Sequence, residues 1–111
     1  MRLILVELNE INFDVVQYYI DSGVSLPSMK HIIDSEMIVT SAESEYKNLE
    51  PWIQWVSVYT GKTAEQHKIF RLGDIERYNE KSFFNTIENL KKSVGVVCSM
   101  NLKNTFLLNN G

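Results

Sequence analysis

The sequence contains little cysteine: Cys98 is alone among 111 residues, so no disulfide bond can form within the chain. A chain of this kind suits a reducing compartment, and we expect a cytoplasmic protein. No apolar run approaches the roughly 20 residues needed to span a bilayer, so we expect no membrane segment. The apolar residues at 3–6 are also too few for the core of a signal peptide.

Positive charge is scarce as well. The chain has 11 lysines and arginines against 14 aspartates and glutamates, which gives a net charge of −3. Its one adjacent basic pair, Lys91–Lys92, falls short of the broad basic surface that binds nucleic acids, so we expect no nucleic-acid partner. The glycine-rich loops of nucleotide-binding folds and the Cys-x-x-Cys motifs of zinc fingers are missing, so these classes have no support.

The remaining composition is that of a folded protein, with 44% hydrophobic and 23% charged residues. The length suits a single domain over residues 1–111. Short apolar runs at 2–8, 37–40 and 93–100 predict strands, because such runs are typical of parallel strands buried on both faces. Cys98 lies in the last run, so we expect a buried, unreactive thiol.

Apolar residues at helical spacing predict helices between these runs, at 13–20, 27–33, 52–59 and 83–90. Pro51 suits the first turn of the third helix, and Gly61 suits its C-terminal end. Strands that alternate with helices predict an α/β fold, with three layers and a mostly parallel sheet covered by helices on both faces. We expect the strands at 2–8 and 94–100 to be adjacent and parallel, because the intervening helices permit a right-handed crossover.

Three segments follow the order and spacing of motifs in a known family. The apolar run at 3–10 ends in Asn-Glu, where that family has a strand ending in Asp-Gly. The segment at 26–33 is similar to the family's Thr-Pro-Asn-Leu-x-x-Leu, which opens a helix. The segment at 51–62 contains Ser-x-x-Thr-Gly, and 67–69 reads His-Lys-Ile where the family has His-Gly-Ile. Together they resemble the N-terminal portion of the alkaline phosphatase superfamily, in particular its type I phosphodiesterase, nucleotide pyrophosphatase and sulfatase-like branch.

This resemblance implies a hydrolase of phosphate or sulfate esters that uses divalent metal ions such as zinc. The family's metal-binding Asp aligns with Asn9, so Asn9 and the adjacent Glu10 are the candidate metal ligands. The family's nucleophile aligns with Pro51, which has no nucleophilic side chain. Glu50 is therefore the candidate catalytic residue, as a ligand or a replacement charge. Each candidate has a structural alternative, in which Asn9 caps a turn and Glu50 complements the helix dipole.

Other side chains also allow a functional and a structural interpretation. Trp52 and Trp55 could stack on a base or a sugar, but their helical spacing favours core packing. His67 could bind a metal ion, but its place in the His-Lys-Ile turn favours a hydrogen-bonded structural role. We expect His31 to be solvated. Glu7 lies inside a predicted buried strand, where a carboxylate needs a partner.

Two hypotheses of function follow. In the first, the chain is the N-terminal fragment of a divergent alkaline-phosphatase-like hydrolase and is inactive in isolation, since the family's later Asp and His ligands have no match here. In the second, it is a catalytically dead relative that serves in binding or assembly. Both predict self-association or contact with a missing C-terminal part, through a sheet edge or the apolar segment Thr105–Leu108.

Overall fold

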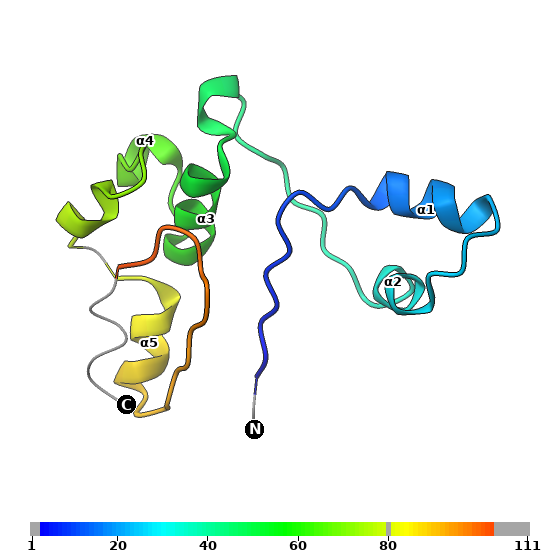
Figure 1. Cartoon of the computed structure of the whole chain (residues 1–111). Coiled ribbons are helices and arrows are strands. Elements are labelled where there is room, and N and C mark those ends of the chain that lie inside the picture. The colour runs from blue at the N-terminus through cyan, green and yellow to red at the C-terminus, as the bar shows by residue number, and fades with distance from the viewer. Residues whose placement is uncertain (1–2, 80, 104–111) are drawn as a thin grey trace. The chain divides into compact units, whose positions relative to one another are not determined.

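The computed structural model describes residues 3–79 and 81–103, and within these ranges it is helical and contains no strand (Figure 1). The predicted α/β fold with a mostly parallel sheet is therefore wrong. The segment 105–108, where we expected self-association, lies outside the described residues. The elements in chain order are α1 (Phe13–Asp21), α2 (Pro27–Ile33), η1 (Tyr46–Asn48), α3 (Pro51–Thr60), α4 (Ala64–His67), η2 (Asp74–Arg77) and α5 (Phe83–Asn89).

The described parts of the three apolar runs contain no regular secondary structure, and most of their side chains are exposed or half-buried. The exposed fraction reaches 84% at Ile4, 90% at Ile38 and 88% at Val97. An apolar run becomes a buried parallel strand only when a neighbouring strand pairs with its backbone and other layers cover both faces. No described segment supplies such a strand. The composition of the runs was therefore not sufficient to predict their structure.

The chain divides into two compact units, Met1–Ser41 and Ala42–Gly111. The first unit contains α1 and α2. At the start of α1, the Asn12 side chain accepts hydrogen bonds from the backbone N–H groups of Asp14 and Val15, at 2.9 and 3.1 Å. The helix is followed by Gly23, whose φ of 89° lies in the left-handed region that glycine adopts readily. Helix α2 begins at Pro27. The first turn of a helix tolerates proline, because the N–H that proline lacks would have no partner within the helix there.

The second unit is built around α3. Ile53, Val56 and Tyr59 lie three residues apart on one side of the helix and are 1–2% exposed. Both α4 and α5 contact this helix (Figure 1). Val56 belongs to a buried cluster with Ile69 and Ile75. The predicted start at Pro51 and the predicted end at Gly61 are both confirmed.

The ends of α3 show why the local sequence predicts this helix. Pro51 occupies the first helical position. Gly61 has a φ of 67°, and its N–H donates to the Ser57 carbonyl at 2.8 Å. A left-handed glycine of this kind closes a helix without the steric penalty that a Cβ atom brings. The preferences of Pro51 and Gly61 depend on the local backbone, so they do not require contacts with distant parts of the chain.

Helix α5 packs its aromatic residues toward α3. Its first residues, Phe83 and Phe84, have ring centroids 6.3 and 5.5 Å from that of Tyr59. The backbone N–H of Ser82 donates to Asn85 Oδ1 at 2.9 Å, which satisfies a backbone donor at the start of the helix. The aromatic contacts therefore hold α5 against the buried side of α3.

Two valines on α3 test this packing, because they differ in burial but share helix and residue type. Val56 is 1% exposed and Val58 is 56% exposed. We expect Val56→Ala to lower the free energy of unfolding by about 2 kcal/mol, since it removes buried methyl groups and leaves a cavity. Val58→Ala should change it by less than about 0.5 kcal/mol. Urea unfolding of both variants measures the difference, and equal effects would contradict the assigned buried face.

Candidate functional site

The third segment of the resemblance forms a connected site at α3 and α4. Helix α4 begins after Thr63, whose backbone N–H donates to Gln66 Oε1 at 2.9 Å. The N–H of Ala64 donates to the Glu43 carboxylate at 2.8 Å. A carboxylate at this point accepts from one of the free N–H groups of the first helical turn. Glu43 therefore ties the loop before α3 to the turn after it.

His67, the last residue of α4, is 3% exposed and is hydrogen-bonded at both ring nitrogens. Its Nδ1 accepts a hydrogen bond from the Ile69 N–H at 3.0 Å. In a neutral imidazole the other nitrogen then carries the proton, so Nε2 donates to Ser57 Oγ, which lies 3.1 Å away. A general base must accept the proton of its nucleophile, and Nε2 in this tautomer cannot. The arrangement fits the predicted structural role of His67.

Burial lowers the pKa of His67, and this is the largest influence on it. The Glu43 carboxylate raises the pKa, while the Lys62 ammonium lowers it. Their combined effect leaves the pKa below the ordinary value of 6.5. The neutral form is therefore favoured in the folded chain, in agreement with the hydrogen bond that Nδ1 accepts.

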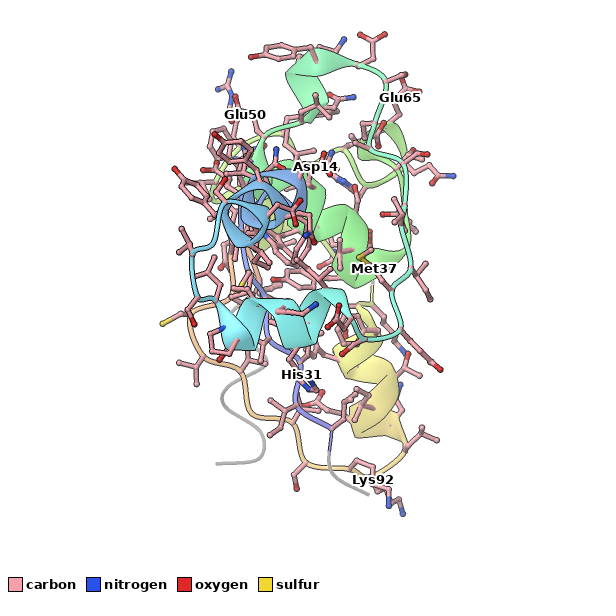
Figure 2. The ribbon with its side chains drawn as sticks, turned by 90° about the vertical axis from the view of Figure 1, so that its right-hand side faces the viewer. Asp14, His31, Met37, Glu50, Glu65 and Lys92 are labelled. Atoms are coloured by element: carbon pink, nitrogen blue, oxygen red, sulfur yellow. The ribbon has the colours of Figure 1, made fainter. Side chains whose placement is uncertain are left out.

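The start of α3 holds the candidate catalytic residue. Glu50 is the N-cap residue with extended backbone, and its carbonyl accepts from the N–H groups of Ile53 and Gln54 at 2.9 and 3.0 Å. Its side chain is exposed (Figure 2). Pro51 follows at the first helical position, where the resembled family has its nucleophile. This helix start thus offers an exposed carboxylate but no hydroxyl or thiol.

The candidate metal ligands lie elsewhere in the chain. Asn9 and Glu10 form a turn in the first unit, whereas Glu50 belongs to the second unit, so the structure does not define one site that contains all three. Glu10 has a φ of 59°. Adjacent turn residues offer one amide and one carboxylate, whereas a bound zinc ion has three or four protein ligands. No group of three or more His, Cys, Asp or Glu side chains suited to a metal ion occurs in the described ranges. The residues do not fit the metal centre that the resemblance implies.

The remaining residues singled out from the sequence have diverse environments. Trp52 Nε1 donates to the Phe70 carbonyl at 3.1 Å, and the Trp55 ring stacks on Tyr59 at 5.9 Å, so both tryptophans pack within the second unit. His31 is exposed on α2, as expected (Figure 2). Glu7 is half-buried. The prediction for Cys98 was wrong: the thiol is exposed, because its segment is not a strand within a sheet.

Two features of this site were not predicted. The Thr63-x-x-Gln66 spacing is a recognisable capping signal and could have indicated α4. Glu43 gave no such signal, because its contact with Ala64 joins residues far apart in the sequence.

Comparisons with protein-family models, with curated proteins and with solved structures each found no match. Among the described residues, no helix combines the length and the apolar character needed to cross a membrane.

The lowered pKa of His67 makes stability depend on pH. Its pKa is 6.5 when unfolded and lower when folded, so the unfolded chain binds more protons between the two values. The contribution of neutral His67 to the free energy of unfolding is fully present above about pH 6.5. It is lost as the pH falls toward the pKa of His67 in the folded chain.

We therefore expect His67→Gln to reduce the loss of stability between about pH 7.5 and about pH 5.5. His31→Gln is the matched control for the loss of a histidine, since His31 is exposed on α2. Urea unfolding at each pH measures the slope. An unaltered slope in His67→Gln would show that this imidazole does not contribute to it.

Proposed function

We propose that the chain is part of a divergent alkaline-phosphatase-like hydrolase and that residues 1–111 do not hydrolyse phosphate or sulfate esters by themselves. The proposal rests on the order and spacing of the three segments described above. The proposed lack of hydrolysis rests on Pro51, which occupies the position aligned with the family's nucleophile. Proline has no side-chain group that can attack an ester.

The backbone at Lys68 is the observation that best supports the resemblance. Lys68 has a φ of 57° and a ψ of 26°, in the left-handed region that glycine adopts most easily. The resembled family has Gly at the corresponding position of its His-Gly-Ile turn. A turn that requires left-handed backbone accounts for a glycine at this position in the family. In this chain Lys68 adopts the same left-handed conformation. The neighbouring Ser57–His67 hydrogen bond gives the Ser-x-x-Thr-Gly and His-Lys-Ile elements a shared structural purpose.

An assay of the whole chain tests the proposed lack of catalysis. With added zinc or manganese, we expect no hydrolysis of a chromogenic phosphodiester or sulfate ester above the rate without protein, since Pro51 cannot form a covalent intermediate. Asn9→Ala should behave like the unmodified chain. Metal-dependent hydrolysis that Asn9→Ala abolishes would overturn the proposal.

Exposed apolar side chains in the first unit favour a second candidate function, which is assembly. The described part of its first apolar run and the residues around Ile38 expose large apolar groups to solvent. Contiguous exposed apolar surface is typical of interaction sites. We therefore propose that the chain associates with itself through this unit. The sheet-edge contact that the sequence suggested is not retained, because the described residues form no sheet.

Substitution of one exposed valine in each unit tests this assembly. Val39 in the first unit and Val97 in the second are 82% and 88% exposed. We expect sedimentation at about 100 μM to detect a dimer, as mass action requires for a micromolar dissociation constant. Val39→Lys should weaken the dimer by about tenfold, because a lysine resists desolvation. Val97→Lys should leave it unchanged. A strict monomer would contradict the proposed self-association.

A further inference from the structure

The second unit contains a cavity of about 290 Å³ at the C-terminal half of α3. Residues of α3, η2, the segment between η2 and α5, α5 itself and the chain at 101–103 line it. The side chain of Asn101 brings this last segment to α3, because its Nδ2 donates to the Trp52 carbonyl at 2.9 Å. Figure 1 shows the segment that follows α5 returning alongside the helices of this unit. The cavity is distinct from the Glu50–Pro51 helix start.

One part of the lining is apolar and well buried. Val56 and Ile75, which are 1% and 8% exposed, belong to the core cluster of the unit. Leu102 adds a further apolar side chain. Apolar walls of this kind stabilise a ligand by removing its hydrocarbon surface from water. A ligand that fills the cavity therefore needs an apolar part.

Among the residues that the structure describes, the charged members of the lining are Lys81 and Lys103. Lys103 Nζ donates to the Tyr78 carbonyl at 3.2 Å. An ammonium carries three N–H donors, so this group can still donate to a ligand. Lys81 is exposed. Among the described lining residues there is no carboxylate, so their charges favour a negative group.

Polar lining residues add further hydrogen-bond donors. Asn85 uses its Oδ1 to accept from Ser82, and its NH₂ group retains two donors. Tyr78 has a buried hydroxyl oxygen that makes no hydrogen bond of ordinary geometry within the described part of the chain. Burial raises the pKa of Tyr78, against a smaller opposing effect of Thr60, so the phenol keeps its proton. A buried hydroxyl whose hydrogen bond is poorly formed is costly, and a ligand oxygen could relieve that cost.

We propose that this cavity binds a small organic anion, with its apolar part against Val56 and Ile75 and its carboxylate or phosphate at Lys81 and Lys103. The volume sets the size of the ligand. Ligand cavities begin at about 300 Å³, and an apolar cavity of about 150 Å³ accommodates benzene. A single aromatic ring with one anionic group therefore matches the space. The inference does not depend on the proposed hydrolase relationship, since it uses residues outside the resemblance's candidate ligands and nucleophile position.

Phenyl phosphate is the probe, and calorimetry with the full chain is the measurement. We expect saturable binding that is at least about tenfold tighter than binding of inorganic phosphate, which lacks the apolar part, or of phenol, which lacks the charge. Benzoate in place of phenyl phosphate distinguishes a carboxylate from a phosphate, and the tighter of the two identifies the preferred group. These comparisons need no variant and so are independent of folding.

Variants locate the site. Lys81→Gln and Lys103→Gln should each weaken phenyl phosphate binding by about tenfold, the effect of losing one charge-assisted hydrogen bond. Lys92→Gln is the matched control, because Lys92 is exposed and outside the lining (Figure 2). In NMR spectra of the unmodified chain, the backbone amides of Asn79, Lys81 and Ser82 should shift on binding.

Several outcomes would overturn the proposal. The first is no saturable binding of phenyl phosphate or benzoate. The second is equal affinity for inorganic phosphate and phenyl phosphate, which would remove the role of Val56 and Ile75. The third is an equal loss of affinity in Lys81→Gln and Lys92→Gln, which would show non-specific attraction between an anion and lysines.

Discussion

The second unit depends on the burial of one side of α3. Ile53, Val56 and Tyr59 remove large apolar surfaces from water, and each such side chain stabilises a fold by about 1.5–3 kcal/mol when fully buried. The helical repeat fixes the direction of each side chain around the axis, so the burial of these three residues also sets the direction of the other side chains of α3. It places Ser57 beside His67 and aligns Val56 with the cavity wall.

The hydrogen bonds of His67 extend this constraint from α3 to the chain beyond α4. The imidazole accepts from the Ile69 N–H and donates to Ser57, so it links a helix side chain to the backbone of the following turn. Glu43 approaches the same turn from the other direction along the sequence. A serine and a histidine, which in other proteins form a catalytic pair, thus serve here to hold the backbone. For His67, the structural role follows from the proton on Nε2, whereas a general base would need Nε2 free to accept a proton.

The helices could be predicted from the sequence because their signals are local. Pro51, Gly61 and the intervening apolar spacing act within the helix itself, and the structure places α3 at the predicted residues. The strands failed because a strand depends on a partner that is distant in sequence. The exposure of Cys98 follows from that same error. At the candidate site, the His-Lys-Ile turn at 67–69 predicted a hydrogen-bonded structural role for His67 but not its partner Ser57. The contact of Glu43 and the tautomer of His67 needed three-dimensional distances.

The location of both tryptophans on α3 has a spectroscopic consequence. Trp52 and Trp55 account for all the tryptophan of the chain, and both lie in the second unit. Intrinsic tryptophan fluorescence therefore reports on that unit alone, whereas α1 and α2 contribute only to far-ultraviolet circular dichroism and, through Tyr18 and Tyr19, to tyrosine signals. If the two optical transitions coincide, the units unfold as one cooperative system; if they separate, each unit has its own stability.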